Sequence, residues 1–510
     1  MAASYRNKII GLIIISFLIR VVIASCTELG NDEVYYWTYS QYLQWNYFDH
    51  PPMVAIWIRI FTGNLQLQQY EMFVRLGSLV SCGIATWVMY GLGKKLHSEK
   101  AGWFIACLYN TSVYASIISG VFILPDSPQM MFWCLSLSMI LKICNDDKSW
   151  RNWLLFGAVT GLCILSKVHG IFIWIGLGSF ILIRKRAWLK LPQLYIAVLI
   201  SAAIASPILF WNMSNNFITY KFHSGRVTVN AFAIHSDGFF REFFGQILYN
   251  NPVNVVIIIL ALIAWSKNKL IKNAALSVYA FIAIPMALIL LLLSLFRDTL
   301  PHWSGPAYVS LLPLAGVYLA FFTKEKSFPA FIKSAAGLII VAAAAGILLI
   351  NFYPGTIGNK SSDILGDGDF TLDMSGWKDA GIKFQNIYLK DVKDSVMPAS
   401  ADMICYKWFP AAHEDYYFCR PLNMQMIGLG IPYDLHEYLW YNVYRKNAGT
   451  LDKAYCIVPS NENYDVHQTY AAYYNHIDSA CAIPSYRNGK LARVFYVYRL
   501  SGWKGSVPFL

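Results

Sequence analysis

The chain has 510 residues, of which 56% are hydrophobic and only 14% are charged, and its formal net charge is +12 at pH 7. In an ordinary soluble domain about a quarter of the residues are charged, so this composition excludes a typical soluble protein. The basic residues lie in short clusters between apolar stretches, and they are not pooled in one patch. The positive charge therefore gives no case for nucleic-acid binding.

About eleven apolar stretches follow one another along the chain, and as helices they would cross most or all of a hydrocarbon core ~30 Å thick. They cover residues 9–25, 72–92, 101–119, 127–143, 153–166, 168–183, 193–211, 253–266, 274–296, 304–322 and 335–352. The chain is therefore expected to be a polytopic α-helical membrane protein with about eleven transmembrane helices.

Basic residues mark one side of the expected membrane domain. They occur at the N-terminus and after every even-numbered stretch, as with Lys94 and Lys95 after the second and Arg184 and Lys185 after the sixth. Loops rich in Lys and Arg stay in the cytoplasm. We therefore expect the N-terminus in the cytoplasm. The loops that follow the odd-numbered stretches, and the C-terminal region, are expected on the outer side.

Two of the outward loops, 26–71 and 212–252, are long. The first is rich in Tyr and Trp, which is typical of a helix that lies in the membrane interface. From about residue 354 the composition becomes polar, and short β-rich runs alternate with helix-like stretches. This pattern predicts a transmembrane domain over 1–353 and a soluble α/β domain over 354–510.

Four cysteines lie in the predicted soluble domain: Cys405, Cys419, Cys456 and Cys481. In an oxidising compartment they could form two disulfides, and four cysteines allow three pairings. Proximity in the sequence favours Cys405–Cys419 and Cys456–Cys481.

The outward side also carries an unusual number of ionisable residues. Charged groups beside a bilayer are costly, which makes them candidates for function. These candidates are Asp32, Glu33, His50, Asp126, Lys167, His169, Arg226, Arg297 and His302. Ordinary structural roles are open to the same residue types, because an aspartate can cap a helix, a lysine can extend to the interface, and a histidine can be a plain loop residue.

Carboxylates and cations on one membrane face suit displacement at a phosphate-bearing lipid. A carboxylate can take the proton from an attacking hydroxyl, and Lys, Arg or protonated His can neutralise a departing phosphate. Enzymes on the outer face have no ATP or nucleotide sugars, so a lipid-linked donor is chemically sensible. A divalent cation is compatible with the carboxylates, although no residue spacing demands one.

The sequence resembles the bacterial family 39 glycosyltransferases of the GT-C group, which include protein O-mannosyltransferases and aminoarabinose transferases of lipid A. The matching motifs, in chain order, are Asp32-Glu33-Val34-Tyr35-Tyr36-Trp37, Tyr47-Phe48-Asp49-His50-Pro51-Pro52, Leu124-Pro125-Asp126-Ser127-Pro128, Gly161-Leu162 to Leu165-Ser166-Lys167, Pro207 to Trp211-Asn212, Phe222-His223 to Arg226, His302-Trp303 to Pro306-Ala307 and Gly376-Trp377. The resemblance covers essentially the whole chain.

This resemblance implies inverting transfer of a hexosyl or pentosyl group from a polyprenyl-phosphate sugar to a hydroxyl of a protein, lipid A or a glycan. Asp32 matches the catalytic aspartate and would act as the general base. Glu33 and Asp126 would position the acceptor or stabilise charge at the anomeric carbon. Lys167 and Arg226 match contacts to the donor phosphate.

Two further histidines complete the expected phosphate site. His50 stands where aminoarabinose transferases have a lysine, and His302 lies near an outward helix end. The same relatives have an arginine where this chain has Tyr35, three residues after Asp32. Both departures argue against an aminoarabinose role without excluding it.

The resemblance also implies a location in the bacterial inner membrane, with the C-terminal domain in the periplasm, and contact with membrane lipids. Two other functions compete with the enzyme: a transporter or flippase of lipid-linked sugars, and a non-catalytic lipid-binding protein. A transporter would be expected to have internal repeats and a site at the membrane midplane. The sequence has no evident repeat, and its ionisable residues gather at one boundary.

Overall fold

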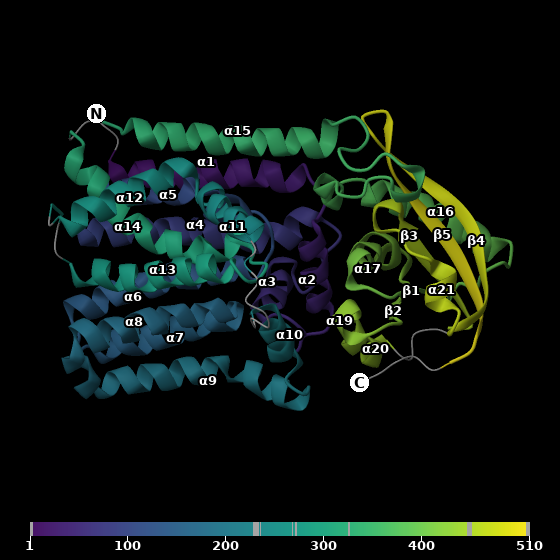
Figure 1. Cartoon of the computed structure of the whole chain (residues 1–510), viewed down its shortest axis with the longest axis horizontal. Coiled ribbons are helices and arrows are strands. Elements are labelled where there is room, and N and C mark those ends of the chain that lie inside the picture. The colour runs from purple at the N-terminus through teal and green to yellow at the C-terminus, as the bar shows by residue number, and fades with distance from the viewer. Residues whose placement is uncertain are drawn as a thin grey trace. The chain divides into compact units, whose positions relative to one another are not determined.

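The computed structural model of the chain describes residues 4–227, 234, 236–267, 269–270, 273–324, 327–445 and 451–505 (Figure 1). Two compact units emerge from the contacts within it. The first consists of Met1–Ala24 and Trp45–Ala343, and the second of Ser25–Gln44 and Ala344–Leu510. The predicted division at residue 353 differs from this one, because the contacts assign part of the first outward loop to the C-terminal unit.

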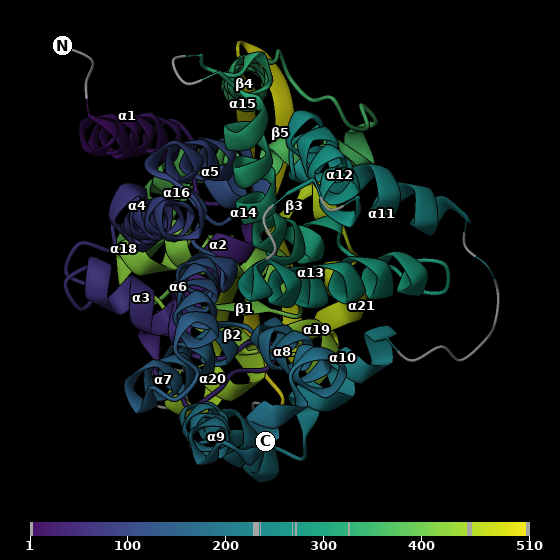
Figure 2. The same cartoon turned by 90° about the vertical axis from the view of Figure 1, so that its left-hand side faces the viewer.

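Helices build the first unit (Figures 1 and 2), and each of the eleven predicted apolar stretches overlaps one of them over most of its length. These helices are α1 (Tyr5–Ser25), α4 (Glu71–Leu96), α5 (Glu99–Thr111), α6 (Asp126–Asn145), α7 (Trp150–Ser166), α8 (Ile171–Arg184), α9 (Pro192–Ser214), α12 (Pro252–Ser266), α13 (Ala274–Leu293), α14 (Gly305–Phe322) and α15 (Ala330–Phe352), the last of which ends in the second unit. Shorter helices connect them: α3 (Met53–Phe61), α10 (Ile218–Val227) and α11 (Ser236–Tyr249).

Within the described residues, seven helices are long and apolar enough to cross a membrane alone, namely α1, α4, α6, α9, α13, α14 with its preceding turn, and α15. An eighth span is formed if α11 and α12, which are bent by 92° at their junction, count together. The sequence predicts about eleven spans, and the difference lies in shorter apolar helices such as α5, with 13 residues. At 1.5 Å per residue α5 is only ~20 Å long. The chain is a polytopic membrane protein.

Helices α6 and α14 form the centre of this unit. Of the most apolar part of each, 78% is buried, against 6% for α15. Glycines bring neighbouring helices close together. A Cβ on Gly93 of α4 would lie 2.6 Å from the Cα of Gly102 on α5, and one on Gly176 of α8 would lie 2.6 Å from the Cα of Ile282 on α13. Larger residues at these positions would separate the helices.

A five-stranded sheet organises the second unit, which confirms the predicted α/β domain. Its strands are β1 (Asp402–Cys405), β2 (Met426–Gly428), β3 (Lys453–Pro459), β4 (Tyr474–Arg487) and β5 (Lys490–Trp503). The order is β2-β1-β3-β5-β4, in which β1 is parallel to β2 and β3, whereas β5 is antiparallel to β3 and β4. Asn488 and Gly489 both have positive φ and close the β4–β5 hairpin.

The second unit also contains several helices, some of which pack on this sheet. They are α2 (Asn31–Gln41), α16 (Trp377–Lys393), α17 (Trp408–Glu414), α18 (Arg420–Leu422), α19 (Pro432–Leu435), α20 (Tyr438–Arg445) and α21 (Val466–Tyr470). Helix α2 packs against α17 although the two are far apart in the sequence. Eight of the eleven residues of α2 are buried, most of them aromatic or apolar, which explains why the segment groups with this unit.

The pairing expected for the soluble-domain cysteines is wrong, because all four are free thiols in the structure. Cys456 on β3 and Cys481 on β4 are separated by β5. Two strand spacings amount to almost 10 Å, which exceeds the Cα separation that a disulfide allows. The Cys419 sulfur contacts the Met403 sulfur at 3.8 Å instead of Cys405.

Candidate active site

A buried ion pair lies at the start of α6. The Lys167 Nζ donates to Asp126 Oδ2 at 2.7 Å, and the Tyr114 hydroxyl donates to Asp126 Oδ1 at 2.7 Å. Both charged side chains are at least 95% buried. The structure thus brings two of the predicted site residues into direct contact, across 41 positions of the sequence.

Local sequence explains how these side chains are placed. Helix α6 begins at Asp126 because Pro125 and Pro128 fit the start of a helix, where their missing N–H groups are not needed. Lys167 directly follows α7 in an extended conformation, just before a short turn that leads into α8. Gly305 makes room for Tyr114, since a Cβ on it would lie 2.2 Å from the Tyr114 ring.

Histidines surround this ion pair. His50, His169 and His302 each lie within electrostatic range of both Lys167 and Asp126. His50 also approaches His223 of α10, with 6.0 Å between the ring centroids. The His169 ring packs on Trp303, and its buried Nδ1 has no hydrogen-bond partner among the described residues. We refer to Asp126, Lys167, His50, His169, His223 and His302 as the histidine-rich cluster.

The electrostatics of this cluster revise one expected role. Burial, followed by the Lys167 ammonium and His223, lowers the pKa of His50 well below its ordinary value, and Asp126 opposes this only in part. His50 is therefore neutral at neutral pH. It can donate a hydrogen bond to a phosphate oxygen, but it does not supply a positive charge. The positive charge in this cluster comes from Lys167.

Arg226 belongs to α10, but its side chain lies outside the described residues. His302 lies in the turn Pro301–Ser304, beside the ring of Tyr249. His169 and His223 are noticeable in the sequence, but nothing there assigns them a role. Tyr114 gives no signal at all, because a tyrosine in an apolar stretch is ordinary.

The other two predicted catalytic residues, Asp32 and Glu33, belong to the first turn of α2 in the second unit. Asp32 is exposed, whereas Glu33 is buried. The backbone N–H of Gly30 donates to Glu33 Oε2 at 2.9 Å. Glu33 therefore helps to cap the helix, and its expected contribution to acceptor binding stays a prediction.

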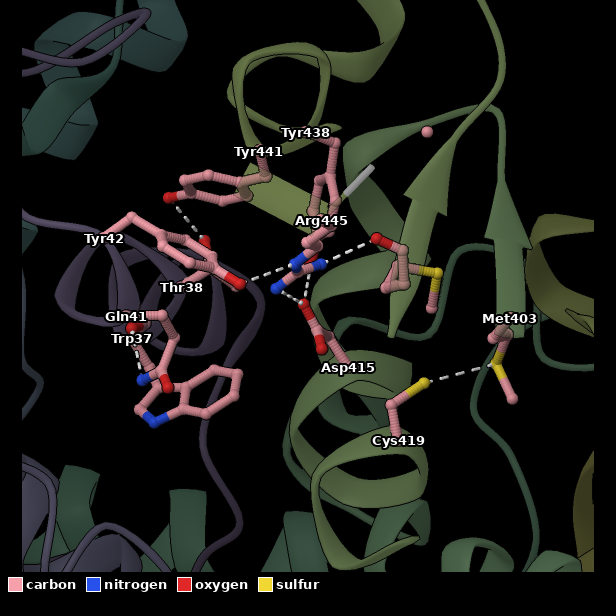
Figure 3. Close-up of polar contacts among 12 residues, drawn as sticks. Trp37, Thr38, Gln41, Tyr42, Met403, Asp415, Cys419, Tyr438, Tyr441 and Arg445 are labelled. Carbon is pink, nitrogen blue, oxygen red and sulfur yellow. Dashed lines mark hydrogen bonds and ion pairs between the residues drawn. The ribbon is translucent and has the colours of Figure 1, made fainter. Parts of the chain in front are cut away.

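Figure 3 shows how the other end of α2 is held. The guanidinium of Arg445 donates to Asp415 Oδ2 at 2.9 Å, to the Met426 carbonyl at 2.7 Å and to the Tyr42 hydroxyl at 3.4 Å. Its carbon lies 5.3 Å from the Tyr441 ring centroid. Tyr42 directly follows α2, so this buried cation links the end of the helix to α20.

We expect Arg445→Met to lower the free energy of unfolding by about 3–5 kcal/mol, because it leaves the Asp415 carboxylate buried without its cation. Thermal unfolding of the full-length protein in detergent measures the change. The matched control is Arg420→Met, whose guanidinium stacks over Tyr416 at 4.6 Å in a half-buried position, and which should cost about 1 kcal/mol or less. Equal losses in the two variants would contradict the importance of the Asp415 contact.

The described residues hold no group of three or more His, Cys, Asp or Glu side chains arranged to bind a metal ion. The remaining chemistry of the cluster is that of a buried ammonium next to neutral imidazoles, which is suited to binding the oxygens of a phosphate.

Comparisons with known proteins identify the fold of the chain and its relatives. The family model described as dolichyl-phosphate-mannose-protein mannosyltransferase matches residues 49–211. Crystal structures of ArnT from Cupriavidus metallidurans, in the apo state and bound to undecaprenyl phosphate, match the fold with a TM-score of 0.61 at 14% identity. They cover 97% and 98% of this chain, and each is itself covered to 98%. The chain shares the GT-C fold of these structures, and it is a membrane glycosyltransferase.

Among curated proteins it is similar to the lipid A galacturonosyltransferase RgtD of Rhizobium johnstonii. The two are 25% identical over 353 residues, which is 68% of this chain and 70% of that relative. The resemblance inferred from the sequence motifs is thereby confirmed, as is the assignment of the chain as an enzyme.

Proposed function

We propose that the protein transfers a sugar from a polyprenyl-phosphate donor to a hydroxyl group of a lipid A-type glycolipid. The similarity to a lipid A galacturonosyltransferase supports the acceptor, and the fold shared with a structure that binds undecaprenyl phosphate supports the donor. The sugar transfer takes place on the periplasmic face of the bacterial inner membrane, with the N-terminus in the cytoplasm and the C-terminal unit in the periplasm. The basic clusters after alternate helices support this orientation.

The observation that carries this proposal is the buried Asp126–Lys167 pair within the histidine-rich cluster. A lysine ammonium has three N–H donors. One of them is taken by Asp126 at 2.7 Å, so others remain for a phosphate oxygen. Neutral imidazoles nearby add hydrogen-bond donors without adding repulsion between cations. This arrangement suits the single negative charge of a phosphodiester and the second charge that develops when the phosphate leaves.

In the proposed reaction Asp32 takes the proton from the acceptor hydroxyl as its oxygen forms a bond to the anomeric carbon. The bond between that carbon and the phosphate oxygen breaks, and its electron pair leaves with polyprenyl phosphate. Attack from the face opposite the phosphate inverts the configuration. Lys167 and its neighbours stabilise the charge on the leaving group, and Asp126 fixes the position of the Lys167 ammonium.

The test is a transfer assay with the purified full-length protein, polyprenyl-phosphate sugars extracted from membranes, and three acceptors: lipid A, a serine-rich peptide and a glycan. We expect sugar on lipid A and none on the other two. A parallel series in EDTA should retain transfer, because Lys167 can provide the positive charge at the phosphate. Sugar on the peptide or glycan alone would overturn the proposed acceptor.

A second arm of the test addresses the transporter alternative. Proteoliposomes with a fluorescent lipid-linked sugar report movement of the donor between leaflets. Transfer to an acceptor without faster movement supports the enzyme. Faster movement with no transfer to any acceptor would replace the enzyme by a flippase.

A further inference from the structure

The start of α2 is fixed by residues that are distant in the sequence. Glu28 accepts a hydrogen bond from the Trp377 backbone N–H at 2.8 Å, and its own N–H donates to the Met374 carbonyl at 3.3 Å. The His413 Nε2 lies 2.9 Å from Asn31 Oδ1, and the His413 ring stacks on Trp377 with 4.1 Å between centroids. These contacts hold the turn that carries Asp32, which follows Asn31 directly.

Asn31 also forms a side-chain hydrogen bond with Asp373. An ionised carboxylate only accepts hydrogen bonds, so Asn31 offers its amide N–H to Asp373 and its carbonyl oxygen to His413. His413 must then be protonated at Nε2. Burial lowers the pKa of His413 well below its ordinary value, which is consistent with a neutral ring. The three side chains therefore form a chain of two hydrogen bonds, in which His413 donates to Asn31 and Asn31 donates to Asp373. We call this hydrogen-bond chain the relay.

Asp373 is a half-buried carboxylate, and Arg493 is the positively charged side chain that acts on it. Burial is the largest cause that raises the pKa of Asp373, the negative charges of Asp32 and Glu462 add to it, and the Asn31 hydrogen bond and Arg493 oppose it. The net pKa is about 6. Arg493 is fully buried and lies over the Trp377 ring at 4.2 Å. Asp373 thus changes its charge in the range between pH 5 and 7, while Asp32 lies within its electrostatic range.

We propose that Asp373 is a positioning residue that acts on Asp32 in two ways: it orients the first turn of α2 through Asn31, and its negative charge makes Asp32 a stronger base. This inference rests on the proposed role of Asp32 as the general base. A negative neighbour disfavours the ionised form of a carboxylate and so strengthens its attraction for a proton. A stronger base removes the acceptor proton faster.

The consequence is a step in the pH profile of transfer near pH 6. Below the step Asp373 is protonated and no longer repels charge on Asp32, so Asp32 is the weaker base. Above it Asp373 is ionised and the rate is higher. The phosphodiester of the donor keeps one charge throughout this range, so it does not produce such a step.

The experiment measures kcat for transfer between pH 5 and 8 in the full-length wild type and in Asp373→Asn. We expect the wild-type rate to rise through pH 6, and the variant to lack this rise. The two rates should agree within about twofold at pH 5, and the variant should be about three- to tenfold slower at pH 7.5. Asp373→Glu keeps the charge, so its rate should rise near pH 6 as the wild-type rate does.

Two further variants separate the proposed effect from a general loss of structure. Asp379→Asn removes the same charge from an exposed position paired with Lys383, and it should keep the wild-type profile. Asn31→Ala breaks the relay and should lower kcat about tenfold or more with little change in KM, since the base is no longer held in place. If Asp32→Asn abolishes transfer but Asp373→Asn retains the step at pH 6, this inference fails and the proposed function stands. If Asp32→Asn keeps full activity, the proposed role of Asp32 fails.

Discussion

Replacing Asp32 by asparagine is expected to lower the rate of sugar transfer by about 10²- to 10⁴-fold, which is the usual contribution of a general base. The substitution keeps the shape of the side chain and removes its ability to accept a proton. Asp32 is exposed on α2, so the thermal stability of the full-length protein should change little. Transfer from a polyprenyl-phosphate sugar, measured at saturating donor, checks the rate, and binding of undecaprenyl phosphate checks that the donor site is intact.

The matched control for this experiment is again Asp379→Asn, which removes an exposed carboxylate of the same unit and should leave the rate unchanged. Equal rates in Asp32→Asn and the wild type would remove Asp32 as the base. A large loss of both rate and thermal stability would instead assign Asp32 to the structure of α2.

The second large effect is expected for Lys167→Met. Removing one member of a buried ion pair leaves the other charge without compensation, and the free energy of unfolding should fall by about 3–5 kcal/mol. Affinity for undecaprenyl phosphate should fall about ten- to a hundredfold, because a charge-assisted hydrogen bond contributes about 1.5–3 kcal/mol. Thermal unfolding in detergent and a binding titration measure the two losses separately.

A double variant distinguishes these two roles of the lysine. In Lys167→Met with Asp126→Asn both charges are absent, so most of the stability should return while the affinity for the lipid phosphate stays low. The control is Lys94→Met, whose partner Glu99 is about half exposed, and which should cost about 1 kcal/mol or less. Recovery of binding in the double variant would show that Lys167 serves only to neutralise Asp126.

Much of the fold follows from residue patterns. Apolar stretches of suitable length coincide with helices because the backbone of a membrane segment must satisfy its hydrogen bonds internally. The change in composition near residue 354 locates the α/β unit for a similar reason, since a polar segment cannot remain in lipid. The membership of residues 25–44 was not predictable in this way. It depends on which surface the aromatic side chains of α2 cover, and composition alone does not specify that surface.

The candidate site was only partly predictable. Asp126 and Lys167 stand out because ionisable residues are rare beside apolar stretches, but their direct contact depends on how α6 and α7 pack. The partners of Asn31 give no signal, because Asp373 and His413 are ordinary residues of a polar domain until the fold brings them to α2. The cysteine pairing failed for a related reason: sequence proximity does not reveal that β5 lies between β3 and β4.

The grouping of α2 with the C-terminal unit has a consequence for engineering chimeras of such enzymes. The simplest way to exchange acceptor preference is to graft the C-terminal region of one relative onto the helices of another, with a single junction after the last helix. In this chain such a graft would separate Asn31 from Asp373 and His413, and Tyr42 from Arg445, which are contacts within one unit. A working chimera needs three junctions, before residue 25, after residue 44 and before residue 344, so that residues 25–44 are inherited together with residues 344–510.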